Sequence, residues 1–274
     1  MKMAQLFLIV VFCSCITTSL IAKTKSARAR HSMEFFNTHN VLRIESYLSF
    51  QTNNGVMTTG YPNLLIRYGL IKVLELRLGL ELSSVNDHNS YTVHTGINPI
   101  QPGIKIRLVK PKGLVPATAF TGSISIPKAA SPAFRQTYWA PTFQFSAEQD
   151  ITPKLSLEYA LGMQWDGSDF SRSYLTSINM EFDFTPTSSV YADAYWLLPE
   201  HDQSDIRIDV GVNRTITQNL QFDLSTGAGL TPAAPEFFFN IGFIFSYNSW
   251  KKLLMHKNSF TQRPVAHPSS TPPR

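Results

Sequence analysis

Hydrophobic residues recur at every second position of the segment VLELRLGLEL, residues 73–82, with charged residues at three of the positions between them. Leucines occupy every second position of this segment, and Glu75, Arg77 and Glu81 stand between them. A helix would spread the leucines around its whole circumference, whereas a strand places all of them on one face. The period of two therefore predicts a β-strand with one aliphatic face and one charged face.

Alternating segments of this kind recur along most of the chain and are separated by turn residues. About twelve strands are predicted in this way, near residues 40–50, 60–70, 73–83, 96–109, 113–126, 138–148, 154–166, 173–185, 188–198, 205–216, 219–229 and 236–247. No amphipathic segment of helical length stands between them in the sequence. The chain is therefore predicted to be all-β.

The connections between the predicted strands alternate between short and long. The first, NNGVMTTG, is of moderate length; the short ones are LIK, VKPKG, QDITP, TPTSS and ITQ, and the long ones are VNDHNSYTVHTG, PKAASPAFRQT, GSDFSR, PEHDQS and TPAAPE. A transmembrane β-barrel has short periplasmic turns, longer outer loops and an even number of strands. A soluble β-sandwich has no reason to sort its loops by length. The pattern favours a transmembrane antiparallel β-barrel of about twelve strands, with the leucines of residues 73–82 facing lipid.

Aromatic residues are predicted to form a girdle at the outer membrane interface. With this topology Trp139 begins an inward-running strand, whereas Trp165 and Trp196 end outward-running strands. Aromatic rings with one polar end favour this depth of the membrane. The predicted girdle consists of Tyr61, Tyr138, Trp139, Trp165, Tyr195 and Trp196.

One continuous apolar run stands near the start of the chain, at residues 4–22. A basic start, an apolar middle and Ala22 at a plausible cleavage point predict a signal peptide over residues 1–22. An uncleaved anchor helix is the alternative. Cys13 and Cys15 both lie in this segment, so the mature chain would contain no thiol, which suits an oxidising compartment. Lipidation of Cys15 is a second alternative.

The net charge of +5 is distributed unevenly. Residues 33–248 carry all 19 acidic residues but only 14 of the 24 basic ones, so the body is acidic and both ends are basic. A nucleic-acid-binding protein would concentrate positive charge on its folded body, and no nucleic-acid partner is therefore expected. The predicted organisation is a signal peptide (1–22), a periplasmic lead-in (23–38), an outer-membrane β-barrel (39–248) and a disordered, basic periplasmic tail (249–274).

The charged face of each predicted strand should line the interior of the barrel. Basic residues dominate the earlier strands and acidic residues the later ones. The predicted lumen-lining residues are Arg43, Glu45, Arg67, Glu75, Arg77, Glu81, Lys105, Arg107, Glu158, Asp166, Glu181, Asp183, Asp193, Arg207, Asp209 and Asp223. Opposed charged walls would create a transverse field that orients a dipolar solute. Alternatively, these residues pair into salt bridges that fill the lumen and hold the barrel together.

Candidate catalytic residues are few. His88 and Ser90 stand two positions apart in a long outer connection, and a lipid hydrolase would need such a pair within hydrogen-bond reach. His39, His94 and His201 show no spacing typical of metal ligands. We therefore predict no catalytic residue, no metal site and no cofactor.

Four segments resemble a known family: YPNLLIRYGL (61–70), VLELRLGLEL (73–82), PGIKIRLVKPKGLVPATAF (102–120) and LGMQWDG (161–167). They resemble outer-membrane β-barrel transporters described as "putative MetA-pathway of phenol degradation", over about residues 40–247 in order and spacing. The resemblance implies a barrel that transports small compounds, aromatic or apolar ones among them, and it carries no catalytic residue. The positions that match recurrent motif residues are Arg67, Glu75, Arg77, Glu81 and Asp166.

The sequence departs from this family at both ends. The lead-in KTKSARARHSMEFFNTHN stands where a Thr-Asp-Arg-Pro-type segment usually precedes the first strand. Relatives usually end on an aromatic residue of the last strand, here Phe245 or Tyr247, whereas this chain continues with a tail.

The function expected from the sequence is passive passage of small molecules across the outer membrane of a Gram-negative cell. The expected partners are membrane lipid, a small-molecule solute and the barrel-assembly machinery. A structural or adhesin-like barrel with a plugged lumen is the alternative, and an outer-membrane lipid hydrolase is a further one.

Overall fold

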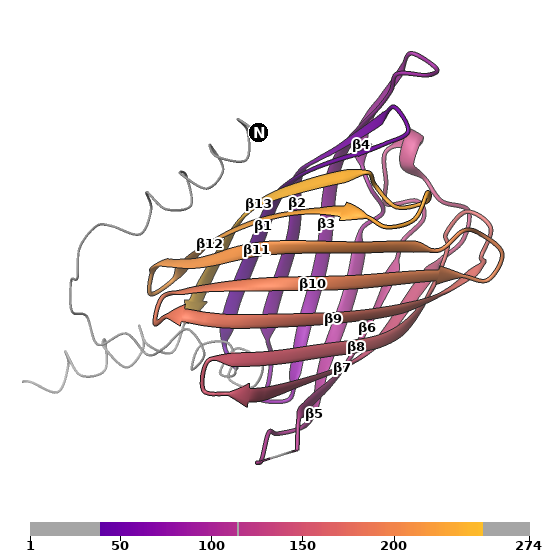
Figure 1. The fold of residues 1–274 in the computed structure, drawn as a ribbon. Coiled ribbons are helices and arrows are strands. Elements are labelled where there is room, and N and C mark those ends of the chain that lie inside the picture. The colour runs from indigo at the N-terminus through magenta and orange to yellow at the C-terminus, as the bar shows by residue number, and fades with distance from the viewer. Residues whose placement is uncertain (1–38, 114, 249–274) are drawn as a thin grey trace, which may run out of the picture.

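The structure is a computed structural model that describes residues 39–113 and 115–248. These residues form 13 β-strands and one short 3-10 helix (Figure 1). The strands are β1 (Val41–Asn53), β2 (Val56–Gly69), β3 (Leu74–Asp87), β4 (Thr92–Ile97), β5 (Gln101–Val109), β6 (Ala117–Ser125), β7 (Ala140–Thr152), β8 (Leu155–Trp165), β9 (Arg172–Thr185), β10 (Ser188–Pro199), β11 (Asp205–Thr217), β12 (Leu220–Gly229) and β13 (Phe237–Asn248), and the helix is η1 (Pro132–Phe134). The predicted signal peptide, lead-in and tail lie outside the described residues.

The strands pair antiparallel with their neighbours and the sheet closes on itself (Figure 1). β1 pairs with β13, with Val41 opposite Asn248, and β2 pairs with β3 on the other side. Within the described chain, every strand except β4 belongs to this closed ring, which confirms the predicted barrel of twelve strands. Closure leaves the ring without unpaired edges. No helix among residues 39–113 and 115–248 is long and apolar enough to span a membrane.

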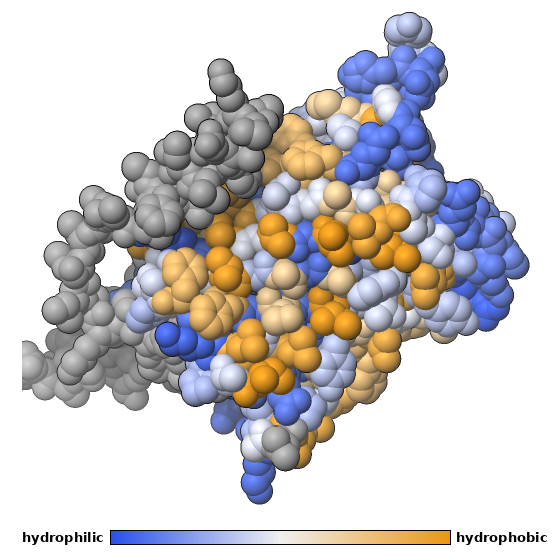
Figure 2. Space-filling model, viewed as in Figure 1, coloured by the Kyte–Doolittle hydropathy of each residue, from blue (hydrophilic) through white to orange (hydrophobic). Residues whose placement is uncertain are grey.

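Burial in the barrel is inverted relative to a soluble protein. The largest fully buried side chains in the described residues are Glu75, Ser83 and Ser189, whereas Leu161 is 62% exposed and Val210 58% exposed. Hydrophobic side chains cover the strands, and hydrophilic ones gather at the end with the longer loops (Figure 2). Apolar residues face outward around a polar interior when the surrounding solvent is hydrocarbon. The aliphatic faces of the strands therefore contact lipid.

The outer end of the barrel differs in detail from the prediction. The segment VNDHNSYTVHTG was predicted to be a loop, but β3 continues to Asp87 and pairs there with the additional strand β4 in a projecting hairpin (Figure 1). The connection that carries η1 docks on this hairpin, because the backbone N–H of Ile97 donates to Ser131 Oγ at 2.9 Å. The first connection, predicted to be of moderate length, is a tight turn at Asn54 and Gly55.

The opposite end carries shorter connections. β7–β8, β9–β10 and β11–β12 are joined by tight turns at residues 153–154, 186–187 and 218–219. The connection between β5 and β6 is longer than its sequence, VKPKG, predicted, because β6 begins at Ala117. The two ends thus differ in loop length as expected for a membrane-spanning barrel, with the short turns on the periplasmic side.

Two adjacent positions on β9 test this orientation. Ser177 lines the interior and Ile178, 42% exposed, lies on the outer face. We expect a charged, membrane-impermeant thiol reagent to modify a Ser177→Cys variant in liposomes and to leave Ile178→Cys unmodified, because hydrocarbon excludes the reagent. Modification is measured by the mass of the protein. Both variants should react after denaturation, and equal reaction of the two in liposomes would contradict the orientation.

Candidate functional site

Glu75 on β3 organises the basic wall of the lumen. The Arg67 guanidinium donates from Nε to Glu75 Oε1 at 2.8 Å, and from Nη1 to Glu45 Oε1 at 2.6 Å. Arg107 Nη2 donates to Glu75 Oε2 at 3.2 Å, and Arg77 Nε lies 3.9 Å from Oε1. One carboxylate is therefore shared among three guanidinium groups, and the side chains of Glu75 and Arg107 are each only 1% exposed.

The neighbouring strand β6 makes room for these long cationic side chains. In the register of β5 and β6, Arg107 lies opposite Ala119 and Lys105 lies opposite Thr121. Ala119 is completely buried. Residues with small side chains at the inward positions of one strand leave room for the long side chains of the adjacent strand. The packing of the basic wall thus depends on the small inner face of β6.

The acidic wall lies on β8 to β12 and is held mainly by neutral donors. The donor–acceptor pairs are Asn179 with Asp193 at 2.5 Å, Tyr191 with Asp223 at 3.1 Å, and Ser189 with Glu181. In the part of the chain that the structure describes, no lysine or arginine forms a salt bridge with Asp193 or Asp223. Asp193 and Asp223 are therefore held by neutral donors and not by the described cations of the basic wall.

Two tyrosines lie flat against the wall next to Asp223. The ring of Tyr191 crosses Gly211 on β11 to reach the Asp223 carboxylate on β12. The ring of Tyr47 covers Gly242, which lies opposite Asp223 in the register of β12 and β13. A side chain at either glycine would collide with the ring, so only glycine allows this close approach. Neither tyrosine was among the predicted site residues.

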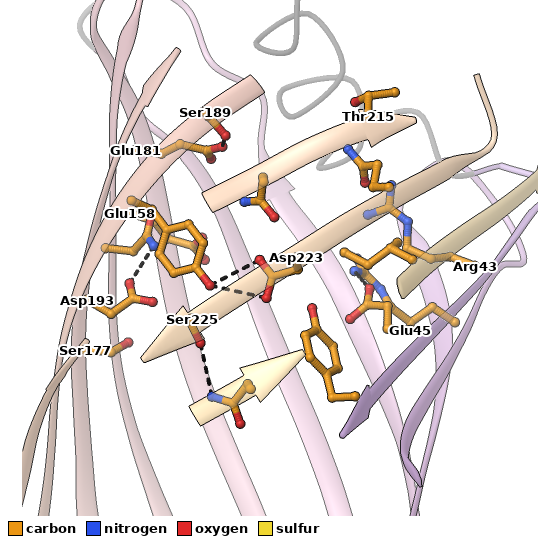
Figure 3. Close-up of a pocket in the computed structure, with 18 of the residues that line it drawn as sticks. Arg43, Glu45, Glu158, Ser177, Glu181, Ser189, Asp193, Thr215, Asp223 and Ser225 are labelled. Atoms are coloured by element: carbon orange, nitrogen blue, oxygen red, sulfur yellow. Dashed lines mark hydrogen bonds and ion pairs between the residues drawn. The ribbon is translucent and has the colours of Figure 1, made fainter. Parts of the chain in front are cut away.

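The two walls enclose a cavity of about 470 Å³ in the lumen (Figure 3). Arg43 and Glu45 lie across the cavity from Glu158 and Asp193 (Figure 3). This placement follows from the topology, because β8 is the strand opposite β1 in the ring. A cavity of this size and polarity can hold a small polar molecule.

A second cavity of about 410 Å³ continues the first toward the outer end. Ser177, Asp193 and Asn240 line both cavities, so the two spaces meet at the level of these residues. Arg207 on β11 lines the second cavity and pairs with Asp205. The lumen is therefore hollow on both sides of the Asp193 level.

The predicted lumen residues fall into groups in the structure. Those around the first cavity are Arg43, Glu45, Arg67, Glu158, Glu181, Asp193 and Asp223, and those around the second are Asp193, Arg207 and Asp209. Glu75, Arg77 and Arg107 belong to the basic wall, Lys105 lies opposite Glu75 in the register of β3 and β5, and Glu81 accepts a hydrogen bond from Ser83 Oγ at 2.9 Å. Asp183 lines a small recess near the β7–β8 turn.

Asp166 lies elsewhere than predicted. It follows β8 in an outer turn, where its Oδ1 accepts hydrogen bonds from the backbone N–H groups of Ser168 at 2.6 Å and Asp169 at 3.4 Å. Such a carboxylate stabilises a turn. Asp166 is therefore a turn residue and does not line either lumen cavity.

Several predicted girdle residues lie near the outer ends of the strands. Tyr138 and Trp165 both contact Phe170, with ring centroids 5.8 Å and 6.3 Å apart, and Trp139 is 54% exposed. Tyr61 is 37% exposed at a position on β2, and Trp196 is half-buried on β10. An aromatic belt at the membrane–water interface would consist of rings at this level of the barrel.

Tyr195 was predicted to belong to the girdle but faces the lumen. It lines the second cavity beside Arg207. Trp196 follows it directly in β10, and successive side chains of a strand point to opposite faces. Because adjacent residues cannot both face lipid, only Trp196 can belong to the outer belt.

His88 and Ser90 lie at the exposed tip of the β3–β4 hairpin. The Ser90 hydroxyl donates to Asp87 Oδ2 at 2.7 Å, and His88 Nδ1 lies 3.1 Å from the carbonyl oxygen of Gly55. Their partners are thus other residues of the hairpin tips. The arrangement stabilises two turns and does not pair a base with a nucleophile.

An exposed ion pair joins the start of β9 to the loop after β10. Arg172 donates to Glu200 from Nε at 3.0 Å and from Nη2 at 2.7 Å. These hydrogen bonds lower the pKa of the Glu200 carboxyl below its usual value. Solvent screens such a pair, so its contribution to stability is small. Glu200 therefore offers a charged control position outside the lumen.

The closed ring, the lipid-facing aliphatic surface and the polar interior define an outer-membrane β-barrel. The chain belongs to the family described as "Putative MetA-pathway of phenol degradation", whose model matches residues 37–247. This match confirms the family expected from the sequence motifs. No curated protein sequence matches the chain.

Solved structures share the fold at low sequence identity. The "COG4313 outer membrane channel from Pseudomonas putida F1" is 14% identical, with a TM-score of 0.58, over 76% of this chain and 96% of that chain. The KdgM porin is 11% identical, with a TM-score of 0.54, over 75% and 99% of the two chains. The NanC porin is 8% identical, with a TM-score of 0.54, over 74% and 98%. At these identities the likeness establishes a common barrel architecture.

Proposed function

We propose that this protein is a passive channel for small polar molecules in the outer membrane of a Gram-negative cell. The observation that carries the proposal is the pair of cavities that meet at Ser177, Asp193 and Asn240 inside the closed ring. Polar side chains line both cavities, and hydrated solutes cross a membrane through such a lining. The protein provides a water-accessible path and the electric field of its charged walls, and passage of a solute requires no covalent chemistry.

The distribution of ion pairs argues against the alternative of a lumen filled by salt bridges. Among the described residues, the ion pairs within the first cavity and the basic wall centre on Glu75 and Glu45. They draw Arg67 and Arg107 toward their own wall instead of across the lumen. The cavity between the walls is consequently maintained. The geometry of His88 and Ser90 likewise gives no support to a lipid hydrolase.

A flux assay with two tryptophan variants tests the proposal. Purified protein is inserted into liposomes loaded with radiolabelled arabinose or para-hydroxybenzoate, the latter because the family description names phenol degradation. We expect the wild-type protein to release solute faster than protein-free liposomes do. A Ser177→Trp variant should slow release by about tenfold, because an indole ring narrows the level where the two cavities meet.

Leu161→Trp is the matched control for this experiment. Leu161 lies on the outer face, so an indole there meets lipid and should leave the flux unchanged. Release no faster than from protein-free liposomes, for both solutes, would remove the channel proposal. Unchanged flux in Ser177→Trp would show that the path does not pass the Ser177 level, and an equal loss in both variants would show that the loss does not come from a narrowed lumen.

A further inference from the structure

The charge of the second lumen cavity comes from few side chains. Among the described residues that line it, the charged ones are Asp193 on β10 and Arg207 and Asp209 on β11, and those contributed by β1 are uncharged. The guanidinium groups that contact Glu75 on the basic wall do not line this cavity. An ion in the second cavity is therefore closest to three charged lining residues.

Arg207 is neutralised by a carboxylate of its own strand. Its Nε donates to Asp205 Oδ1 at 2.7 Å, and its Nη2 donates to Asp205 Oδ2. Two parallel hydrogen bonds of this kind pair a guanidinium group strongly with a carboxylate. The pair adds no net charge to the cavity, so the excess of negative charge there belongs to Asp193 and Asp209.

Asp193 and Asp209 lie directly opposite each other in the register of β10 and β11. Asn179 donates a hydrogen bond to Asp193 at 2.5 Å, and the buried Oδ1 of Asp209 has no hydrogen-bond partner in the described chain. Within residues 39–113 and 115–248, no lysine or arginine forms an ion pair with either carboxylate. Even if two adjacent carboxyl groups share one proton, the pair keeps one negative charge.

This pair stands at the level where the two cavities meet. Asp193 lines both cavities together with Ser177 and Asn240, which are uncharged, and Asp209 lines the second cavity. A solute that moves from one cavity to the other therefore passes close to the pair. Because protein and lipid of low polarity surround the lumen, the field of this charge acts on every ion that passes.

The first cavity does not reverse this charge. Arg67, one of its cations, donates to Glu45 at 2.6 Å and to Glu75 at 2.8 Å. In the described part of the chain, five carboxylates but only two guanidinium groups line the first cavity: Glu45, Glu158, Glu181, Asp193 and Asp223 against Arg43 and Arg67. A cation that has passed Asp193 therefore enters a space that still contains more acidic than basic groups.

Aromatic rings accompany the carboxylates of the first cavity. Asp193, Glu158 and Asp223 surround the same space (Figure 3). The Tyr191 hydroxyl donates to Asp223 at 3.1 Å, and Tyr47 lines the cavity as well. The face of an aromatic ring carries negative charge density and attracts ammonium groups. The lining of the first cavity thus suits organic cations as well as metal ions.

We infer that Asp193 and Asp209 determine the charge selectivity of the lumen, and that the channel favours small cations, organic ammonium compounds among them, over anions. A cation at the level of Asp193 is attracted by the pair, whereas an anion is repelled there. The inference rests on the proposed channel function and names the class of solute for it.

The first test measures the zero-current potential of the protein in a planar lipid bilayer under a KCl gradient at neutral pH. K⁺ and Cl⁻ have nearly the same mobility in water, so a neutral pore gives almost no potential. We expect K⁺ to be about tenfold more permeable than Cl⁻, because one carboxylate beside the path lowers the energy of a cation and raises that of an anion. The preference should decrease at high KCl concentration, where salt screens the charge.

The decisive variant combines Asp193→Asn with Asp209→Asn, which keeps the size of both side chains and removes their charges. We expect its preference for K⁺ to fall to about twofold or less. The measured quantity is a ratio of permeabilities, so a change in the total conductance of the variant does not affect it. Glu200→Gln, which removes a carboxylate outside the lumen, should keep the wild-type ratio. A double variant that is as selective as the wild-type protein would refute the role of the pair.

Two organic ions extend the test to solutes. Choline and isethionate share a hydroxyethyl group and carry a permanent positive and a permanent negative charge, so neither crosses lipid in a neutral form. We expect proteoliposomes to release choline about tenfold faster than isethionate, for the same electrostatic reason as K⁺ and Cl⁻. In the double variant the two rates should approach each other.

The outcomes separate this inference from the channel proposal. If the protein released arabinose but showed equal permeability to K⁺ and Cl⁻, or a preference for Cl⁻, the inference would fail and the channel would stand. If the bilayer showed no conductance and the liposomes released no arabinose, the channel proposal would fail and the inference with it.

Discussion

A Glu75→Gln variant is expected to lose about 3 to 5 kcal/mol of its free energy of unfolding, because it leaves buried cations without their counter-charge. Glu75 is 1% exposed and is contacted by Arg67, Arg77 and Arg107. Glutamine has nearly the same shape, so packing is preserved and only the charge is lost. The three guanidinium groups would then repel one another at close range, where little water screens their charges.

The measurement is urea unfolding of the refolded protein in lipid vesicles, followed by the shift of the folded band on a gel. Glu81→Gln is the matched control, because Glu81 also faces inward from β3 but its hydrogen-bond partner is the Ser83 hydroxyl. This control should cost about 1 kcal/mol or less. Adding Arg107→Met to Glu75→Gln should restore part of the loss, because one uncompensated charge is removed. A Glu75→Gln barrel as stable as the control would disprove the role assigned to this carboxylate.

The barrel was predictable wherever lipid constrains the sequence. Each strand that crosses the membrane must be apolar on one face, and residues 73–82 show this pattern without exception. The closed ring then follows, because hydrocarbon offers no partner to an unpaired strand edge. The alternation of short and long connections supplied the direction of the chain.

The prediction was wrong where the strands leave the membrane. β4, Thr92–Ile97, and the end of β3 stand above the ring and have polar residues on both faces, so no alternation marks them. The tight turn at Asn54 and Gly55 carries the Asn-Gly dipeptide typical of hairpins. That signal was present, but the polar residues around it resembled a loop.

The charged lining was accessible to sequence reasoning only in part. Arg43, Glu45 and Tyr47 occupy every second position of β1, so their side chains must all point to the same face of the strand. The prediction kept the two charged residues and omitted the tyrosine, which occupies the cavity beside Asp223. If every second residue, starting from a charged one, had been assigned to the lumen, the prediction would have included Tyr47 and Tyr191 and would have placed Tyr195 in the lumen.

The partners of each charged residue could not be read from the sequence. The contact of Glu75 with Arg107 depends on the register of β3 and β5, which are separated by the β3–β4 hairpin. A shift of the register by one residue would reverse the facing of every side chain on the strand. The division into a shared-carboxylate basic wall and an acidic wall held by neutral donors is thus a property of the folded barrel.

A Leu161→Arg variant is expected to destabilise the barrel in lipid by about 2 to 4 kcal/mol, the cost of placing arginine on the lipid face near the middle of the membrane. Leu161 is 62% exposed and lies near the middle of β8, several residues from either end of the strand. From there the guanidinium cannot easily reach either headgroup region, and hydrocarbon does not solvate it.

The matched control for Leu161→Arg is Gln144→Arg on the neighbouring strand β7. Gln144 lines the first cavity, so arginine at this position enters a polar lumen that also contains Glu158. Its effect on the free energy of unfolding should stay within about 1 kcal/mol, as for a solvated ion pair. The measurement is the free energy of unfolding of both variants in vesicles. Equal losses would mean that Leu161 does not face lipid or that Gln144 does not face the lumen. A large cost at Leu161 alone places the leucine rows against the acyl chains and the charged rows in the lumen.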